Sequence, residues 1–548
     1  MSDLHYPFWP KGLPKNLTLP QTTLHANLEI SARKYPNKPA LIYYGYELSY
    51  QQLLNEVEKM AAYLQQECGI KKGDRVLLYL QNSPQFVIAF YAILRADAVV
   101  VPINPMNKSE ELAHYIEDTG ATTIFVAQDL YSHLVKLNHP QIQRMILTCY
   151  ADYLPAECEF TLPLFVSADK LVVRKPKVVA WQEALATNLQ PAPSLTGPDD
   201  LCVMPYTSGT TAHPKGCMHT HGSVMYNTLS GITWYQANTQ DSVYLAALPF
   251  FHVTGMQGNM NSPIYIGATV IIMSRWDREV ALALIERYRI SRLALIAAMV
   301  VDLLASPNLD KYDLSSVSRI SGGGAAMPEP VAKKLDEQFG LKYIEGYGMS
   351  ELMAASHINP EHRPKRQCLG VPIFDVDARI IDVDTLQELP QGKVGEIIVH
   401  GPQMMKGYWN NPKADQEVFL ELDGKTFIRT GDIGRIDEDG YFFMVDRLKR
   451  MINASGFKVW PVEVESLMYK HPAILEACVV GAQDEKRGET VKAVVVLKAD
   501  YPEKLTEQEL ISWCKEHMAA YKVPQIIEFI EELPKTASGK ICWRDLQN

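Results

Sequence analysis

A run of glycine and hydroxyl side chains that ends in a lysine is the segment of this chain best suited to hold phosphate groups. Its residues are Tyr206-Thr207-Ser208-Gly209-Thr210-Thr211-Ala212-His213-Pro214-Lys215-Gly216. Glycines let the backbone approach a ligand closely, hydroxyls and amide hydrogens can surround phosphate oxygens, and Lys215 adds a mobile positive charge. The spacing differs from the GxxxxGK[ST] loop of P-loop NTPases, because the lysine follows the proline. We therefore predict a phosphate-holding loop, with a solvated Ser/Thr/Gly linker as the alternative.

Four further segments carry residue types suited to nucleotide chemistry. They are Gly346-Tyr347-Gly348-Met349-Ser350-Glu351, Thr430-Gly431-Asp432, Asp446-Arg447-Leu448-Lys449 and Pro534-Lys535-Thr536-Ala537-Ser538-Gly539-Lys540. Taken singly, Asp432 after a Thr-Gly pair could form only a turn, and Arg447 beside Asp446 could form only a surface ion pair. Together, in this order, the five segments resemble the ANL superfamily of adenylating enzymes, which contains acyl-CoA synthetases, beetle luciferases and the adenylation domains of peptide synthetases. The resemblance covers nearly the whole chain.

The resemblance implies a nucleotide site. Tyr347 is expected to stack against adenine, with Gly346 leaving room for the base edge, and Asp432 is expected to accept hydrogen bonds from both ribose hydroxyls. Arg447 would help to hold the ribose or phosphate. Ser350 stands where the family usually has threonine, and it keeps the hydroxyl. The residues that the resemblance assigns to ATP and AMP are Thr207, Ser208, Gly209, Thr210, Thr211, Lys215, Gly324, Ala325, Gly346, Tyr347, Gly348, Ser350, Asp432 and Arg447.

Three residues, Lys540, His252 and Glu351, are expected to act at the reacting groups. A carboxylate that attacks the α-phosphate of ATP brings two anions together, so a lysine that bridges them stabilises the charge-rich transition state. The resemblance assigns that role to Lys540, and its alternative is a solvated surface charge. Glu351 is expected to bind magnesium, which prefers carboxylate and phosphate oxygens. His252 would border the substrate carboxylate, with a satisfied core histidine as the alternative.

The region that resembles the family's acid-pocket wall favours a neutral, apolar acyl group. Peptide-synthetase domains usually recognise an amino group with an aspartate there, and no acidic residue lies between Phe250 and Met260. Small residues from Gly322 to Ala326 add apolar walls. The expected acyl-pocket residues are Trp234, Phe251, Val253, Gly322 and Gly323. For Trp234, a gate on the acyl tunnel and ordinary core packing are equally good interpretations.

The second half of the predicted reaction depends on the C-terminal part of the chain. Ser455, Gly456 and Phe457 match the loop that lines the pantetheine tunnel in acyl-CoA synthetases. Lys449 is similar in position to the hinge about which the small domain swings, and its alternative is a solvated linker lysine. No carrier domain with a serine for phosphopantetheine is recognisable, which favours free coenzyme A as the acceptor.

We therefore predict an ATP-dependent, AMP-forming acyl-CoA synthetase of the fatty-acid ligase type, an acid–thiol ligase that uses ATP, Mg²⁺ and coenzyme A. Medium or long fatty acids are the leading substrates. A ligase for short thioether, branched or aryl acids, or luciferase-like oxidation of an acyl adenylate, remains open. A nucleotide-binding scaffold without catalysis is disfavoured because Glu351, Asp432 and Lys540 are all present.

The composition argues against several other classes of protein. The formal net charge is −10, and no basic cluster could neutralise a run of nucleic-acid phosphates. Nine cysteines without a CxxC pair fit buried thiols in a reducing cytosol better than disulfides or a zinc site. No apolar run approaches the roughly 18 residues of a membrane span, and no signal peptide is recognisable. We expect a cytoplasmic protein whose partners are a small-molecule carboxylic acid, ATP and coenzyme A, and leave peripheral membrane contact and a homodimer open.

Strands and helices must position these residues, and their signals alternate along the chain. Strand patterns at 75–80, 98–103 and 122–127 are separated by a helix that opens at Ser83-Pro84 and by another from Ser109 to about Gly120. A second series has strands at 268–273, 292–296 and 318–320, a helix to about 288, and the strand 342–345 before Gly346. This alternation predicts parallel sheets covered on both faces, with ligands at the carboxyl ends of the strands.

A chain of 548 residues is too long for one hydrophobic core, and its character changes after Arg447. We predict an adenylate-forming N-terminal domain at 1–447 and a mobile C-terminal domain at 448–548. The latter should have a helix opened by Pro461, strands at 475–480 and 491–497, and a capping box from Thr506 to Glu509. The expected fold class is α/β, with a large N-terminal domain of parallel and mixed sheets in layered subdomains plus a small mobile α+β C-terminal domain. The segment 151–193 is less regular and receives no role.

Overall fold

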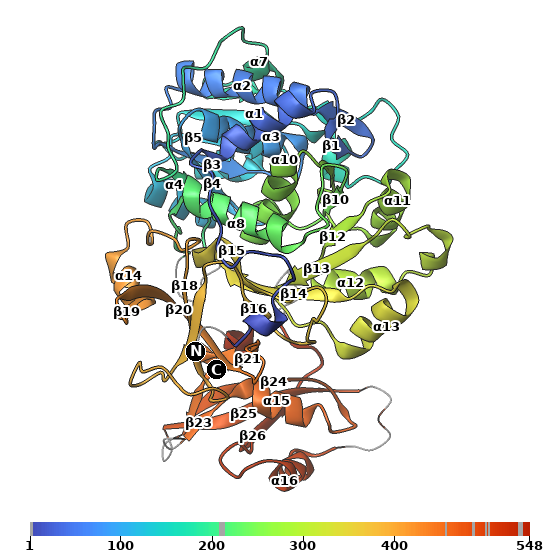
Figure 1. The fold of residues 1–548 in the computed structure, drawn as a ribbon, viewed down its shortest axis with the longest axis vertical. Coiled ribbons are helices and arrows are strands. Elements are labelled where there is room, and N and C mark those ends of the chain that lie inside the picture. The colour runs from blue at the N-terminus through green and yellow to red at the C-terminus, as the bar shows by residue number, and fades with distance from the viewer. Residues whose placement is uncertain are drawn as a thin grey trace.

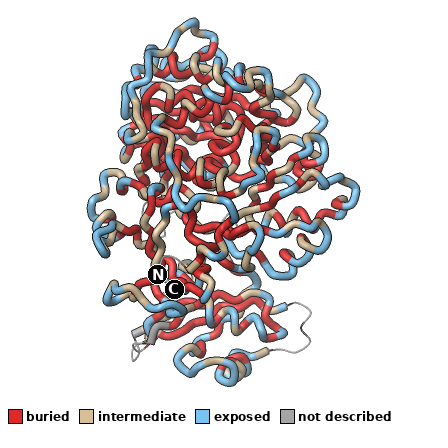
Figure 2. Tube along the Cα trace, viewed as in Figure 1, coloured by how far each residue is buried: buried red, intermediate tan, exposed pale blue. Residues whose placement is uncertain are grey.

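A computed structural model describes residues 4–207, 214–454, 457–484, 488–498, 501, 505–534 and 541–547 of the chain, with backbone alone at 457, 458 and 488. Figure 1 shows a large layered part above a smaller C-terminal part, with the described N-terminal segment reaching down between them. Figure 2 shows that buried backbone is concentrated in the sheets and the helices covering them. This is the α/β architecture with layered sheets and a small α+β unit that the sequence predicts. None of the described helices is long and apolar enough to cross a membrane.

The first sheet has the order β7-β6-β5-β3-β4-β8-β9 and is parallel except at the β8–β9 pair. Its strands are β3 Arg75–Tyr79, β4 Val99–Pro102, β5 Thr123–Ala127, β6 Arg144–Thr148, β7 Val178–Ala180, β8 Leu201–Val203 and β9 His219–Thr220. Its helices include α2 Tyr50–Gln66, α3 Pro84–Arg95, α4 Ser109–Thr119, α5 Tyr131–Leu137, α6 Leu164–Ser167 and α7 Trp181–Leu185. All five residues of β5 are buried, as expected for a strand covered on both faces.

The predicted start of the helix at Ser83-Pro84 and the predicted end of the helix at Gly120 are both confirmed. Ser83 caps α3, because its hydroxyl accepts a hydrogen bond from the Phe86 amide at 3.2 Å, and Pro84 fills the first turn. Gly120 ends α4 at φ +67°, a left-handed conformation that glycine adopts without strain. The irregular segment from 151 to 193 proves to supply the edge strand β7 and the buried Trp181, whose indole donates to the Tyr153 hydroxyl at 3.0 Å.

The second sheet has the order β16-β15-β14-β13-β12-β10-β11-β1-β2. Its strands are β1 Pro39–Tyr43, β2 Tyr46–Ser49, β10 Val243–Ala246, β11 Thr269–Ile272, β12 Arg292–Ala294, β13 Arg319–Gly323, β14 Tyr343–Met349, β15 Ala354–Ile358 and β16 Val371–Pro372. The run from β14 to β1 is parallel, and the outer pairs are antiparallel. The loops that follow β10, β12 and β13 therefore leave the sheet at one edge.

Helices of different lengths precede the strands of this second sheet or connect them. They are η1 Tyr6–Phe8, α1 Leu24–Lys34, α8 His221–Trp234, α9 Val253–Met256, the π-helix η3 Gln257–Asn261, α10 Ser262–Ile266, α11 Arg278–Tyr288, α12 Ala297–Leu304, η4 Leu309–Lys311, α13 Glu329–Phe339 and η5 Ser350–Leu352. The strand predicted at 342–345 continues to Met349, so the Gly346–Gly348 motif lies inside β14 rather than after it. Antiparallel pairing with β15 extends the strand through the motif.

A third sheet carries the end of the large part. Its order is β17-β18-β20-β19, and β21 pairs with β20. The elements are β17 Asp377–Ile381, β18 Gly395–His400, α14 Pro412–Val418, β19 Phe419–Leu422, β20 Lys425–Ile436 and β21 Phe442–Arg447. Because β20 is twelve residues long, its second half reaches back to β14, where Asp432 accepts a hydrogen bond from the Tyr347 hydroxyl.

The C-terminal part has a sheet and an apolar core of its own. Its elements are η6 Leu448–Arg450, β22 Ile452–Ala454, β23 Phe457–Val459, α15 Pro461–Met468, β24 Ile474–Asp484, β25 Gly488–Leu497, α16 Glu507–His517, β26 Ile526–Phe529 and η7 Trp543–Leu546. Both bonds of the predicted capping box form between Thr506 and Glu509. The buried Val464, Val479 and Val491 belong to a cluster separate from that of the large part. The exact boundary at 447 stays a prediction.

Candidate active site

The two ends of the predicted phosphate loop are held together as a narrow hairpin. The Thr207 amide donates to the Lys215 carbonyl at 2.9 Å, and Tyr206 pairs with Gly216 across an antiparallel bridge. The Tyr206 hydroxyl donates to Asp118 at 2.5 Å, which ties the hairpin to α4. A tight hairpin base brings Thr207 and Lys215 to one place. The predicted Ser208, Gly209, Thr210 and Thr211 lie outside the described residues.

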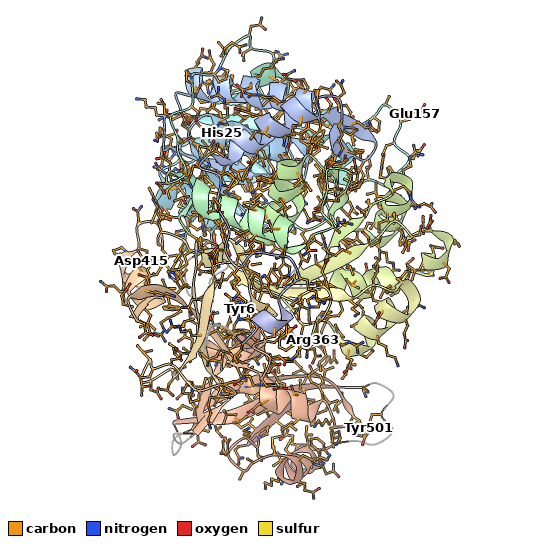
Figure 3. The ribbon with its side chains drawn as sticks, viewed as in Figure 1. Tyr6, His25, Glu157, Arg363, Asp415 and Tyr501 are labelled. Carbon is orange, nitrogen blue, oxygen red and sulfur yellow. The ribbon has the colours of Figure 1, made fainter. Side chains whose placement is uncertain are left out.

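One edge of this hairpin pairs with a segment nearly two hundred residues away, 406–409. Cys217 forms an antiparallel bridge with Tyr408, and the Trp409 amide donates to the Gly216 carbonyl at 2.8 Å. Asp415 of α14, labelled in Figure 3, accepts a hydrogen bond from the Tyr408 amide at 2.7 Å. The pairing puts the Tyr408 ring under the Lys215 ammonium, 4.1 Å from Nζ to the ring centroid. This cation lies at the mouth of the predicted phosphate loop.

Glu351 contacts the hydroxyl of the same tyrosine. The Tyr408 hydroxyl donates to Glu351 Oε1 at 2.7 Å, and Glu351 is only 8% exposed. Its backbone is held as well, because the Met405 amide donates to the Glu351 carbonyl at 2.9 Å. Tyr408 therefore bridges the predicted phosphate-binding lysine and the predicted metal-binding carboxylate. The arrangement presents a cation and an anion side by side, which suits a magnesium-bound polyphosphate.

A buried histidine fixes the turn that carries Ser350 and Glu351. His219 Nε2 donates to the Ser350 carbonyl at 2.7 Å, and a carbonyl can only accept, so the ring proton is on Nε2. Burial lowers the pKa of His219 to about 4, and the ring is neutral at neutral pH. Asn227 of α8 adds a second support by donating to the Leu352 carbonyl at 3.0 Å. The turn that carries Ser350 and Glu351 is thus positioned from α8 and the strand before it.

The nucleoside side of the site is built where β14 meets β20 and β21. The Tyr347 hydroxyl donates to Asp432 Oδ2 at 2.6 Å, and Arg447 Nε lies 3.1 Å from Oδ1. Asp432 and Arg447 are register partners on adjacent strands, so the pair is fixed by the sheet. Burial, and then the Asp432 charge, raise the pKa of Tyr347 well above its ordinary value, which keeps the phenol a donor. An ionised carboxylate only accepts hydrogen bonds, which is the property that the expected contact with ribose hydroxyls requires of Asp432.

Close approach of neighbouring strands explains four of the predicted glycines. A Cβ on Gly322 would lie 2.0 Å from the Leu295 carbonyl oxygen, and one on Gly323 would lie 2.4 Å from the Gly346 carbonyl oxygen. On Gly348 it would lie 1.5 Å from the Ala354 carbonyl oxygen, and on Gly346 3.2 Å from that of His357. Gly324 has a φ of +81° and, with Ala325, is exposed beyond the end of β13. The glycines beside Tyr347 therefore let β14 pack closely against both neighbouring strands.

His252 is exposed, so the alternative of a satisfied core histidine is wrong. Its Nδ1 accepts a hydrogen bond from the Thr254 amide at 3.3 Å and caps α9. Phe251 is half-buried and Val253 is buried, on either side of it. Because α9 packs on β15, the neighbour of β14, the structure brings the His252 wall to the edge that carries Tyr347.

Trp234 is placed as a core residue. It is 1% exposed, its indole donates to the Asn359 carbonyl at 3.2 Å, and its ring meets Trp9 and Phe374 edge-on at 4.8 and 5.6 Å. These contacts favour core packing over a gate on the acyl tunnel. The gate remains a prediction without structural support.

The predicted residues of the C-terminal part are only partly described. Lys540, Ser455 and Gly456 lie outside the described residues, and Phe457 is described by its backbone in β23. Lys449 is exposed in η6, and its pKa is lowered by partial burial and then by the charges of Lys215 and Arg544. The predicted hinge therefore lies near the cation of the phosphate loop.

Tyr408, His219 and Asn227 are site residues that sequence reasoning missed. None belongs to one of the five segments, and their spacing carries no signal. Tyr408 lies 57 residues from Glu351, and His219 lies 131 residues from Ser350. Only the tertiary pairing of these segments identifies them.

Several known proteins and two family models are similar to this chain. A family model described as AMP-binding enzyme matches residues 28–409, and one described as AMP-binding enzyme C-terminal domain matches residues 463–540. The chain is 37% identical to a long-chain-fatty-acid–CoA ligase of Bacillus subtilis strain 168, over 98% of this chain and 96% of that protein. It is 32% identical to a probable 4-coumarate–CoA ligase of Dictyostelium discoideum, over 90% of this chain and 88% of that protein. The crystal structure of ATP-bound MatB from Rhodopseudomonas palustris matches with a TM-score of 0.83 at 26% identity, and the match covers 96% of this chain and 98% of that one.

Proposed function

This chain belongs to the family of AMP-binding enzymes, and from that premise we propose that the acid it activates is a long-chain fatty acid. The chain is an AMP-forming acyl-CoA synthetase, for which ATP, a carboxylic acid and coenzyme A are the substrates. Two groups of contacts described above support the proposal that the chain forms an adenylate. The first group consists of Tyr347, Asp432 and Arg447, which contact one another. The second group consists of Lys215, Tyr408 and Glu351, in which Tyr408 contacts both of the others.

The first group would bind the nucleoside. Asp432, already oriented by Tyr347 and Arg447, accepts hydrogen bonds from the ribose hydroxyls. Arg447 also offsets negative charge at the α-phosphate. Because Asp432 is nearly buried, its bonds to a bound ribose are poorly screened by water.

The second group would hold the phosphates and Mg²⁺. Among the described residues no three potential ligand side chains gather into a metal site, so Glu351 would hold Mg²⁺ together with phosphate oxygens of ATP. The ion would offset phosphate charge. Glu351 suits this role because Tyr408 holds one carboxylate oxygen and orients the other. Lys215 would pair with the phosphates from the adjacent hairpin.

The reaction would proceed in two balanced steps. A carboxylate oxygen of the acid attacks the α-phosphorus, and the bond to pyrophosphate breaks to give acyl-AMP. The thiol of coenzyme A then attacks the acyl carbonyl, loses its proton, and releases AMP. We assign Lys540 to the first step, where two anions converge, and the Ser455–Phe457 loop to the second. Both assignments rest on the family resemblance.

The choice of a fatty acid is supported by the wall after β10. Two buried amides near it are paired within the protein: Gln257 accepts from the Thr228 hydroxyl at 3.0 Å, and Asn261 accepts from the Tyr91 hydroxyl at 3.0 Å. Asn259 donates to the Leu245 carbonyl at 2.9 Å, and its Oδ1 has no partner among the described residues. Among the described residues from 250 to 260, no acidic side chain is present to recognise an amino group. An aryl acid remains the alternative, because one relative is a probable 4-coumarate–CoA ligase.

Pyrophosphate release and acyl-CoA formation should be measured with octanoate, dodecanoate, palmitate, oleate and 4-coumarate, with and without coenzyme A. We expect the highest kcat/KM with palmitate or oleate. A higher value with 4-coumarate would overturn the choice of acid but not the adenylation chemistry. Lys540→Ala serves as the chemical control and should lose about 10²- to 10³-fold in adenylation. It should keep transfer from a supplied acyl adenylate.

A membrane surface would be a natural source of such an acid. The exposed segment from Lys170 to Lys177 contains four cations beside Leu171 and Val172, and Val172 is 73% exposed. We propose peripheral contact of this segment with anionic lipid. Co-sedimentation with phosphatidylglycerol vesicles, absent with phosphatidylcholine and lost in Arg174→Glu/Lys175→Glu, is the expected result. Equal sedimentation of the parent and variant would exclude this surface.

A homodimer and a cytoplasmic location stay predictions from the sequence.

A further inference from the structure

A buried asparagine connects the two large sheets beside the proposed acid wall. Asn82 lies three residues after the end of β3, directly before the Ser83 cap of α3, and is 4% exposed. The wall itself follows β10 of the other sheet. Asn82 therefore contacts a segment that its own sheet does not contain.

The Asn82 amide is fully engaged by the backbone at the start of that wall. Its Nδ2 donates to the carbonyls of Ala246 at 3.3 Å and Leu248 at 2.9 Å, and its Oδ1 accepts from the Phe250 amide at 2.7 Å. The three partners alternate along five consecutive residues. One side chain thus sets the path of the chain from the end of β10 to Phe250.

A second set of contacts holds Asn82 in place. The Ser274 hydroxyl donates to the Asn82 carbonyl at 2.7 Å, and the Ser274 amide donates to the Tyr44 hydroxyl at 3.2 Å. Tyr43 joins the same serine through its hydroxyl at 2.6 Å. Since these residues come from the ends of β1 and β11, the support and the wall belong to the same sheet.

The backbone between Phe250, which Asn82 contacts, and His252 is held tightly by its neighbours. A Cβ on Gly255 would lie 2.2 Å from the Pro249 carbonyl oxygen, so the chain folds tightly back on itself there. The His252 amide donates to the Pro249 carbonyl at 3.2 Å, and the Met256 amide donates to the His252 carbonyl at 2.9 Å. The buried Phe250 ring packs against Phe86 of α3, with centroids 5.5 Å apart. A shift at Phe250 must therefore reach His252.

We propose that Asn82 is a positioning residue that sets the place of the His252 wall, and with it the fit of the acid. The inference rests on the proposed function, because that function assigns the wall to the acid. Only an amide supplies both two donors and an acceptor at this point. An aspartate would put a buried charge against two carbonyl oxygens. An aliphatic side chain would remove the bonds to the Leu248 carbonyl and the Phe250 amide, while the Ala246 carbonyl would keep the bond that it accepts from the Met273 amide at 3.2 Å.

The test compares Asn82→Ser with a matched asparagine elsewhere. Asn359 is equally buried and makes the same set of bonds: it donates to the Glu345 and Cys368 carbonyls at 3.1 and 3.0 Å and accepts from the Lys365 amide at 2.9 Å. Asn82→Ser should raise KM for the acid about tenfold or more and shift the acid chain-length profile, with KM for ATP within about twofold of the parent. Asn359→Ser should lower thermal stability comparably and leave the acid profile unchanged.

A milder variant guards against misfolding. Ser274→Ala removes the bond to the Asn82 carbonyl together with the bond to the Tyr43 hydroxyl, and it leaves the three bonds of the Asn82 side chain in place. It should change KM for the acid in the same direction by a smaller factor. Unchanged acid KM in both variants, or equal rises of both KM values, would overturn the inference. If the parent enzyme releases no acid-dependent pyrophosphate, the proposed function and this inference fail together. If the parent is active and Asn82→Ser keeps its acid profile, the inference alone fails.

Discussion

Glu351 is nearly buried, and the Tyr408 hydroxyl decides how its carboxylate is oriented. Hydrogen bonds to a charged group are stronger than neutral ones because the charge is poorly solvated inside the protein. The same ring lies under Lys215. Removal of the hydroxyl alone therefore separates the two roles of this tyrosine.

Tyr408→Phe should weaken the use of Mg²⁺ while leaving Lys215 in place. A lost bond to a carboxylate is worth about 1.5 to 3 kcal/mol, so the Mg²⁺ concentration needed for half-maximal rate should rise at least about tenfold. Initial rates across a Mg²⁺ series at saturating ATP measure this. Tyr115→Phe, on the neighbouring α4, is the control and should match the parent. A Tyr408→Phe enzyme with the parental Mg²⁺ dependence would show that Glu351 is not the metal ligand.

At the scale of elements, an aromatic cluster joins the N-terminal segment to α8. Trp9 packs edge-on against Trp234 and Phe374, and the Arg363 guanidinium lies 4.0 Å from the centroid of the Phe8 ring. Figure 3 shows Tyr6 of η1 and Arg363 in the same region, above the C-terminal part. The cluster closes the large part on the side away from the first sheet.

Trp234→Ala should cost about 3 to 5 kcal/mol of stability and leave the profile of accepted acids unchanged, because the ring fills core space. Urea unfolding followed by tyrosine and tryptophan fluorescence gives the first quantity, and the acid panel gives the second. A changed profile at little cost in stability would restore the interpretation of Trp234 as an acyl gate. Trp234→Phe should recover most of the lost stability.

The connection between the two parts is tied down on both sides of Lys449. Asp446 Oδ2 accepts from the Val462 amide of α15 at 2.9 Å. Arg450 pairs with Glu465 and donates to the Val479 carbonyl at 3.2 Å. A swing about Lys449 must therefore break the Asp446–Val462 bond, whereas a pivot before Asp446 would preserve it.

Lys449→Pro should leave the first half-reaction working and stop the second. Adenylation needs Lys540 over the phosphates, whereas thiol attack needs the Ser455-Gly456 loop at the acyl carbonyl. A pivot must change φ and ψ between these states, and proline holds φ near roughly −65°. Single-turnover pyrophosphate release and acyl-CoA formation from preformed acyl adenylate measure the two steps separately. Transfer at the parental rate would place the pivot before Asp446.

At the scale of the whole molecule, three buried histidines sit where distant elements meet. His219 holds the Ser350 turn, His221 accepts from the Leu24 amide of α1 at 3.0 Å, and His357 packs edge-on against Tyr347 at 5.6 Å. Burial lowers the pKa of His219 to about 4, and of His221 and His357 to about 3, from an ordinary value of 6.5. All three are neutral in the folded protein at neutral pH.

Stability should therefore be full above pH 6.5 and fall as the pH drops toward 4. In that range the unfolded chain binds protons on these rings while the folded protein does not, so the unfolded state is favoured. Each ring costs about 1.4 kcal/mol at pH 5.5, or about 4 kcal/mol for the three. The free energy of urea unfolding across this pH range measures it. His357→Phe should remove the part of the slope that this ring contributes, and His362→Phe, at an exposed position, should keep the parental slope.

Local signals in the sequence determined most of the elements and the chemical type of the site. Ser83-Pro84, Gly120 and the Thr506–Glu509 box each mark a helix end in the structure, because capping depends on residues a few positions apart. The five ordered segments identified the adenylating family, since each places its functional groups within a few residues. The meeting of Tyr347 with Asp432 and Arg447 follows from that order only once β14, β20 and β21 are paired.

Tertiary structure alone decided which distant residues complete the site. Tyr408 on Glu351, His219 on Ser350 and Asn82 on Phe250 join positions 57, 131 and 168 residues apart. Such contacts depend on the order of strands in a sheet and on the packing of one sheet against another, which local propensity does not encode. The burial of Trp234 and the exposure of His252 have the same cause, because the neighbours of a side chain come from every element packed around it.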